Sequence, residues 1–309
     1  MRYVWSAVGF IFSGIALYYF FQFVPSNLPA QILANYDVFL VGSAILVPAY
    51  VIRGYKTWLL LGELKTGRAA IAGSLYASIA LNNVLPFRLG DILRLFYLRT
   101  ALKIGLVKAT TALLIERVVD LLVILALFVL TAATIAGGKI SELAAALFWD
   151  LSAGWLLVAA ATVVVGSVGV VNFRSTIWRV AAPVLSGLGL NTTRTVKLLV
   201  AAVLQWVLEI MVLSLVTSRL LFDVDGGQAV LSSFMANLST LIPSAPGYVG
   251  TFEVAGIVPF KLLSGQITEA AAVFVILYHL VIWTFSTVLG MLSGVWLVVG
   301  WLIARPLEA

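Results

Sequence analysis

The amino-acid sequence predicts an all-α polytopic membrane protein with about six full transmembrane helices and two re-entrant helical hairpins. The chain is 62% hydrophobic and 10% charged, with a mean hydropathy of +1.10. A soluble domain needs more polar surface than this composition supplies. Apolar runs of about 20 residues recur, the length that an α-helix needs to cross a hydrocarbon core of about 30 Å. We therefore expect residues 1–309 to form a single transmembrane domain.

The predicted full spans are apolar segments without a polar interruption. They are residues 4–23, 37–54, 107–136, 152–172, 196–221 and 267–302. Their continuous apolar character differs from the alternating pattern of a transmembrane β-barrel. The length of the last segment leaves open whether it forms one helix or two.

Basic residues predict the orientation of these spans. The basic residues that fall on one side of the membrane are Arg2, Arg53, Lys56, Lys65, Arg68, Arg174, Arg179, Arg194 and Arg305. The opposite short loops, residues 24–36, 137–151 and 222–226, contain only Lys139. By the positive-inside rule we expect a multi-pass protein of the cell (cytoplasmic) membrane with both termini in the cytoplasm.

Residues 69–103 form an apolar stretch that is interrupted by the polar run LNNVLPFRLGDILR, which includes Asn82 and Asn83. The stretch begins and ends on the cytoplasmic side, so we expect a re-entrant hairpin. Pro86 ends the first half-helix because it removes a backbone donor, and Gly90 and Asp91 suit the start of the second. Irregular backbone at membrane depth is tolerated only where it is buried in protein or lines a polar cavity. The hairpin therefore indicates a site.

Residues 227–262 repeat this pattern. The turn residues and polar residues of this second stretch are Asn237, Pro243, Pro246, Gly247, Gly250 and Glu253. Pro86 and Pro246 are 160 residues apart, as are Gly90 and Gly250, and both Asp91–Glu253 and Arg117–His279 are 162 apart. An odd number of full spans separates the stretches, so the second hairpin enters from outside and the pseudo-repeats, about 1–136 and 152–302, are inverted. Inverted repeats with interrupted helices indicate a transporter, although a purely structural repeat would give the same pattern.

Charged residues lie within the predicted spans. Glu116, Arg117 and Asp120 interrupt an apolar helix, where each charge costs about 2.5–3.5 kcal/mol near the bilayer centre. Further ionisable residues lie in the two hairpins and in the second half of the chain: Arg88, Asp91, Arg94, Glu209, Glu253 and His279. One interpretation is a self-neutralised network that fixes the first hairpin, for example through Arg88 and Asp120. The other is that arginines are held for an anionic head group, since the guanidinium binds phosphate in a bidentate manner.

The sequence favours no catalytic chemistry. It has no cysteine and one histidine, His279, which argues against zinc, haem or any other metal site. Walker and Ser-His-Asp motifs are absent, so we expect a protein that is not an enzyme, without cofactors or a nucleic-acid partner. Glu253 and His279 are candidates for a coupled proton, the alternative being a histidine that is only hydrogen-bonded.

Three motifs occur in order along the chain: NNVLPFRLGDILR, ERVVD and PSAPGYVGTFE. With them the chain resembles the flippase-like integral membrane family, also called the lysylphosphatidylglycerol synthase transmembrane-region family, which includes the flippase half of the multiple peptide resistance factor. The resemblance implies lipid translocation and a conserved core of Arg88, Asp91, Arg94, Glu116, Arg117, Asp120 and Glu253. Asp91 stands where the family usually has Glu, and His279 where many members have Arg. We see no aminoacyl-transferase domain, so synthesis of lysyl lipid is not expected.

We therefore expect a lipid flippase that works by alternating access, with Arg88, Arg94, Asn82 and Asn83 at the head group. Asp91, Glu116, Arg117 and Asp120 would set the charge balance. The expected partners are membrane lipids: an anionic phospholipid, a polyprenyl-phosphate-linked glycan or a glycolipid. The alternatives are a non-catalytic partner of a lipid-modifying enzyme or glycosyltransferase, and a transporter of a small soluble anion. A closed central pocket would suit the small anion, and a groove open sideways would suit a flippase.

Overall fold

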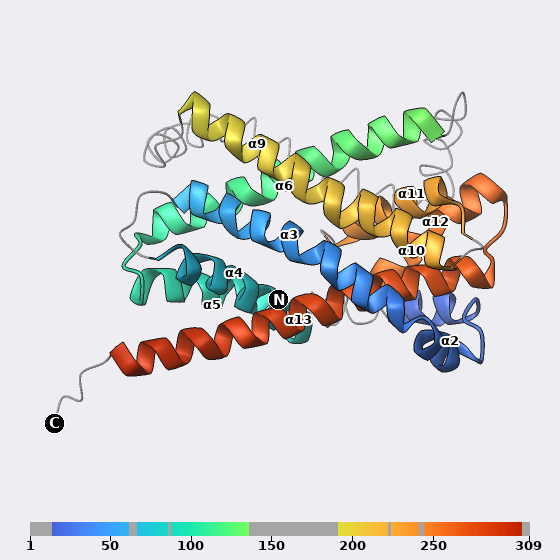
Figure 1. The fold of residues 1–309 in the computed structure, drawn as a ribbon, viewed down its shortest axis with the longest axis horizontal. Coiled ribbons are helices and arrows are strands. Elements are labelled where there is room, and N and C mark those ends of the chain that lie inside the picture. Colours follow the sequence, from blue (N-terminus) through green and yellow to red (C-terminus); the bar gives the residue numbers. More distant parts are fainter. Residues whose placement is uncertain are drawn as a thin grey trace.

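A computed structural model describes residues 14–61, 67–85, 88–135, 191–221, 224–240 and 244–304, and it is helical in all of its regular elements (Figure 1). The helices are α2 (Leu28–Ala34), α3 (Tyr36–Leu61), α4 (Arg68–Val84), α5 (Leu89–Thr100), α6 (Leu106–Ile135), α9 (Thr192–Trp206), α10 (Leu213–Leu221), α11 (Gly226–Ser239), α12 (Thr251–Ser264) and α13 (Glu269–Ala304). A π-helix, η3 (Val207–Val212), joins α9 to α10, and a 3₁₀ turn, η4 (Pro246–Tyr248), precedes α12. The all-α prediction is confirmed for this part of the chain.

Four of these helical segments are long and apolar enough to cross a membrane: Tyr36–Leu61, Leu106–Ile135, Thr192–Ser218 and Glu269–Gly300. The segment at 267–302 is one helix, α13. The predicted span 152–172 and the first half of the predicted span 4–23, residues 4–13, lie outside the described residues. Residues 14–21 of the second half are helical. The count of six full spans therefore stays a prediction.

The predicted end of the second span, at residue 54, is wrong. Helix α3 continues to Leu61. Arg53 and Lys56, which are expected at the cytoplasmic side, are instead buried in the protein at 9% and 1% exposure. A basic residue remains within an apolar helix when an acidic partner from another helix neutralises it. Two of the residues that indicated the orientation are therefore part of the interior.

Helices α4 and α5 form an antiparallel hairpin that opens at one end of the molecule (Figure 1). An apolar cluster holds that end together: Leu61, Ile71, Leu98, Ile104, Ala109 and Leu198. It contains the end of α3, the start of α4, the end of α5 and the starts of α6 and α9.

Helices α11 and α12 form a second hairpin that opens at the opposite end (Figure 1). A Cβ at Gly227, at the start of α11, would lie 3.0 Å from Ile135, the last residue of α6. Leu262 and Leu263, near the end of α12, pack against Ala132 and Leu231 at the same end. The order of one long helix, two short helices and one long helix thus occurs twice in the described part of the chain. The inverted repeat with re-entrant hairpins stays a prediction.

The tips of the hairpins have unusual backbone conformations. Arg88, which precedes α5, has φ 52°, and Gly247 and Gly250, which precede α12, have φ 66° and 92°. Glu253 accepts a hydrogen bond from the Gly250 backbone N–H at 2.7 Å, so its carboxylate caps α12. Pro86 and Pro243 lie outside the described residues.

Helices α4 and α13 approach each other closely at Gly290. A Cβ there would overlap the Tyr76 carbonyl oxygen and lie 2.5 Å from the Ala80 Cβ atom. We expect Gly290→Ala to lower the free energy of unfolding by about 1–3 kcal/mol, because overpacking separates the two helices. Unfolding in SDS titrations measures this.

The matched control is Gly300→Ala on the same helix, where no atom of the described residues lies within 4 Å of the added Cβ. It has the same change in helix propensity, roughly 0.5–1 kcal/mol in favour of Ala. Equal stabilities of the two variants would contradict the close packing of α4 and α13.

Candidate functional site

A polar cavity of ≈ 130 Å³ lies between the two hairpins and the long helices. Of the residues predicted from the sequence, those that line it are Asn82, Asn83, Arg117, Asp120, Glu209, Asn237 and His279. Arg53 also lines the cavity. The interior positions of the first half and of the second half therefore converge, as expected for a site between repeats.

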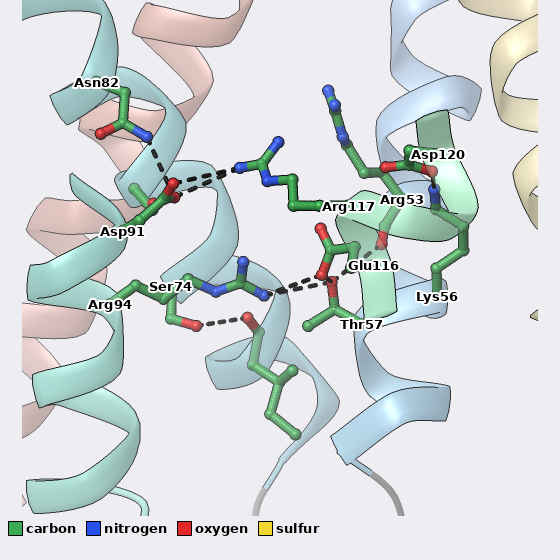
Figure 2. A network of polar contacts seen from close by, with 12 residues as sticks. Arg53, Lys56, Thr57, Ser74, Asn82, Asp91, Arg94, Glu116, Arg117 and Asp120 are labelled. Atoms are coloured by element: carbon green, nitrogen blue, oxygen red, sulfur yellow. Dashed lines mark hydrogen bonds and ion pairs between the residues drawn. The ribbon is translucent and has the colours of Figure 1, made fainter. Parts of the chain in front are cut away.

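Asp91 and Arg117 join the first hairpin to α6. The Arg117 guanidinium lies 3.5 Å from the Asp91 carboxylate, and Ser78 and Asn82 of α4 donate to the same carboxylate at 2.9 and 3.2 Å (Figure 2). The Arg117 side chain is 40% exposed. Arg117 is therefore an arginine of the cavity wall with surface still available to a ligand.

Glu116 receives two donors at one carboxylate oxygen. Arg94 of α5 lies 3.5 Å from its carboxylate, and the Thr57 hydroxyl of α3 donates at 3.0 Å (Figure 2). Arg94 and Glu116 are 3% and 4% exposed. This pair fixes α5 and α3 to α6 and does not line the central cavity.

Asp120 binds Lys56 of α3, and the Trp206 indole N–H donates to the same oxygen at 3.1 Å. The example pair Arg88–Asp120 is therefore wrong, because Asp120 pairs with Lys56. The second carboxylate oxygen of Asp120 is buried and has no hydrogen-bond partner among the described residues.

Arg53 and Glu209 pair at 3.5 Å. The guanidinium lies 5.5 Å from the ring centres of both Tyr50 and Trp206, a cation–π arrangement. Gln205 donates to the other Glu209 oxygen at 3.0 Å. Glu209 belongs to the π-helix η3, and π-helical turns are frequent at functional sites.

Sequence reasoning missed that Arg53 and Lys56 are interior residues, because both lie near the predicted end of a span. Arg53 and Glu209 are 156 residues apart, as are Tyr36 and Thr192, where α3 and α9 begin. This offset differs from that of the hairpin motifs and depends on the helix starts of the structure, so the sequence alone did not pair Arg53 with Glu209.

Glu253 and His279 form the equivalent pair of the second half. The His279 Nδ1 atom lies 2.6 Å from Glu253 Oε1, and the ring stacks on Phe252 with 4.0 Å between ring centres. Asp91 with Arg117 and Glu253 with His279 each join the second helix of a hairpin to the long helix that follows.

Arg88 connects the tips of the two hairpins. Its guanidinium donates to the Thr240 carbonyl and lies 5.9 Å from the Tyr248 ring centre. Among the described residues no carboxylate pairs with it. The expected roles of Arg88 and Arg94 at a head group stay predictions.

A second cavity, of ≈ 730 Å³, lies between α4, α5 and the end of α13. Its lining is mainly apolar, with Leu93, Phe96 and Leu297, and it includes Ser78 and Arg94. Ser78 lines this second cavity, whereas Asn82 and Arg117 line the central one. The Asp91 carboxylate contacts each of these three side chains. Asp91 therefore lies between the two cavities.

The network as a whole is self-neutralised in the described part of the chain. Each of Asp91, Glu116, Asp120 and Glu209 has a basic partner. These pairs do not exclude ligand binding, and both interpretations of the charges stay predictions. No group of three residues suited to a metal ion occurs within the described ranges.

The fold and the site define a multi-pass α-helical membrane protein with a charged interior cavity. The family model of the lysylphosphatidylglycerol synthase TM region matches residues 6–290, and the chain belongs to this family. It is 26% identical over 317 residues to the glycosyltransferase AglD of Haloferax volcanii. That match covers 88% of this chain and 51% of the relative, so the chain spans about half of the relative's length. No solved structure matches.

Proposed function

We propose that the protein is a translocase that moves a lipid with an anionic or glycosylated head group across the cell membrane, without catalysing a chemical reaction. The observation that carries this proposal is the central cavity. It lies between two hairpins that open at opposite ends of the molecule, and Arg53 and Arg117 line it. In the membrane both hairpins would be re-entrant, and both termini would lie in the cytoplasm.

Two features favour an anion in the central cavity. The Arg117 side chain is partly exposed to it, and the buried Arg53 Nε–H has no acceptor among the described residues. Buried polar groups in proteins nearly always have a partner, so an unpaired donor beside a cavity indicates a place for water or ligand. Arginine is suited to phosphate because two N–H groups bind two oxygens at once.

Two features favour a lipid as the carrier of that anion. The second cavity is mainly apolar and lies directly beside Asp91, so a hydrocarbon chain has space next to the head-group site. The family takes its name from the synthase of lysylphosphatidylglycerol, and the relative is named as a glycosyltransferase. The first name associates this kind of membrane region with the synthesis of a lipid, and the second with the transfer of a sugar. An anionic phospholipid, a polyprenyl-phosphate-linked glycan and a glycolipid are the proposed classes.

Movement of the hairpins would expose the cavity alternately to the two sides. The pairs Asp91–Arg117 and Glu253–His279 each attach one hairpin to a long helix. An anion that binds Arg117 competes with Asp91 for the same guanidinium. Binding would thereby loosen the attachment of the first hairpin and couple substrate to movement.

The size of the central cavity favours a second candidate, a transporter of a small soluble anion. A volume of ≈ 130 Å³ accommodates several waters or one phosphate-sized group. The third possibility, a membrane partner that only holds a lipid-modifying enzyme in place, requires no transport at all. One set of proteoliposomes separates the three.

Tail-labelled fluorescent phosphatidylglycerol in proteoliposomes is quenched from outside with dithionite, and phosphatidylcholine serves as the zwitterionic probe. We expect the protein to move phosphatidylglycerol faster than protein-free liposomes do. Arg117→Gln should reduce this rate at least about tenfold, because a charge-assisted hydrogen bond contributes roughly 1.5–3 kcal/mol. The control is Arg99→Gln, on the exposed last turn of α5.

Equal rates with and without protein would overturn lipid translocation. An Arg117→Gln variant as fast as the wild type would overturn the role of Arg117 in binding the head group. Uptake of radiolabelled phosphate by the same liposomes without lipid movement would support the small-anion transporter. Neither activity, together with stable co-purification of an enzyme, would support the membrane partner.

A further inference from the structure

The two equivalent ion pairs of the repeat differ in one chemical property. In the first half the base is Arg117, which stays protonated at every physiological pH. In the second half the base is His279, and the imidazole of histidine is the side chain that ordinarily changes its charge between pH 5 and 8. Both bases line the central cavity, and each contacts the acid of the hairpin helix that precedes it. The second pair therefore has a state that the first pair lacks.

The two ring nitrogens of His279 have different surroundings. Nδ1 faces Glu253 Oε1 at 2.6 Å, and Phe252 covers one face of the ring. Glu253 Oε2 is held by the Gly250 N–H at 2.7 Å, so the carboxylate is fixed on both oxygens. Nε2, the remaining nitrogen, has no partner among the described residues and belongs to a side chain of the cavity wall.

This arrangement makes Nε2 a switchable donor. When His279 is neutral, Nδ1–H donates to Glu253 and Nε2 presents a lone pair, which repels an anion. When His279 is protonated, Nε2–H is a donor with positive charge and attracts an anion. The permanently charged Arg117 on the other half has no such off state.

We propose that Glu253 and His279 form a proton site that couples the uptake of one proton to the binding of one anion in the central cavity. Before binding, Glu253 is ionised and His279 is neutral. A proton from the water on the open side joins Nε2, the anion accepts the Nε2–H hydrogen bond, and both leave on the other side. The charges of the proton and of a monovalent anion cancel, so the loaded cavity has the same net charge as the empty one when it opens to the other side.

This inference rests on the proposed function and adds the coupling ion to it. The titratable and charged groups that surround the pair at the cavity come from every element packed around it. They are Tyr50 and Arg53 of α3, Arg117 and Asp120 of α6, Glu209 of η3, Tyr248 of η4 and Tyr278 of α13. Asp120 and Glu209 already have basic partners, Lys56 and Arg53. Glu253, by contrast, has a histidine as its partner.

Because His279 is the single histidine of the 309 residues, its protonation is directly observable. Protein purified without a histidine tag and labelled with ¹³C-histidine gives one ring Cε1–H signal, which is followed from pH 5 to 9. We expect dihexanoyl-phosphatidylglycerol to raise the midpoint by about one unit, which corresponds to tenfold tighter binding of the anion by the protonated form. Dihexanoyl-phosphatidylcholine, without net charge, should not shift it. A signal that does not titrate, or equal midpoints with both lipids, would overturn the inference.

Transport provides the second test. Translocation of labelled phosphatidylglycerol should fall at least about tenfold as the pH rises through the range in which His279 loses its proton. A pH-sensitive dye inside the liposomes should report proton movement that accompanies the lipid. His279→Arg, which copies the first half, should remove both the pH dependence and the proton movement. If His279→Arg keeps the wild-type pH dependence, the coupling is wrong and lipid translocation stands. If the midpoint shifts but no lipid moves, the proton site stands and lipid translocation fails.

Discussion

Replacement of Lys56 by methionine is expected to lower the free energy of unfolding by about 3–5 kcal/mol, the usual result of removing one partner of a buried ion pair. Lys56 and Asp120 are 1% and 5% exposed, and Trp206 is the only other described donor to Asp120. The variant leaves a carboxylate in the interior without a counter-charge. Unfolding in SDS, monitored by tryptophan fluorescence, measures the loss.

The paired variant Lys56→Met with Asp120→Leu should recover most of this stability, because the isolated charge is gone. Lys197→Met, on the exposed face of α9, removes a lysine without a buried partner and should change stability by less than about 0.5 kcal/mol. A Lys56→Met protein as stable as the wild type would show that Lys56 does not neutralise Asp120.

Replacement of Arg53 and replacement of Glu209 are expected to have opposite effects on the binding of anionic lipid. Arg53→Gln removes a cation from the cavity wall, and lipid translocation should fall at least about tenfold. Glu209→Gln frees the guanidinium from its acidic partner, so the protein should bind anionic lipid more tightly and release it more slowly. Lipid binding by fluorescence and translocation in proteoliposomes measure the two effects.

The double variant separates a functional role from a structural one. Arg53→Gln with Glu209→Gln should restore stability relative to either single variant, because no unpaired charge remains. Its translocation should stay as low as that of Arg53→Gln. Recovery of translocation together with stability would mean that the pair only holds α3 against η3.

Much of the architecture was predictable because lipid as solvent imposes local rules. Hydropathy alone identifies the long helices α6 and α13 within a few residues, since only a continuous apolar helix crosses hydrocarbon. Asn, Pro and Gly mark the interruptions near residues 85 and 245, and the structure has irregular backbone at both. The offset of 162 residues related Asp91 to Glu253 and Arg117 to His279, and the structure pairs Asp91 with Arg117 and Glu253 with His279. That these residues form ion pairs was not predicted.

Pairing across helices was less predictable. The sequence indicated that Glu116 and Asp120 needed basic partners, and it offered Arg88 and Arg94. Arg94 does pair with Glu116, but Asp120 takes Lys56, from a segment that hydropathy assigned to a loop. Rotation of α3 and α6 about their axes decides which residues meet.

The sequence by itself therefore determined the class of protein, the places where its helices are interrupted and the presence of charges that must face inward. Each of these follows from a residue and its close neighbours in the chain, because the transfer of a side chain into lipid has a free energy set by its own chemistry. Only the tertiary structure decided that Arg53 and Lys56 are interior residues and which acid each one binds. A buried charge is stabilised by a partner a few ångströms away, and here that partner is 64 or 156 residues distant along the chain.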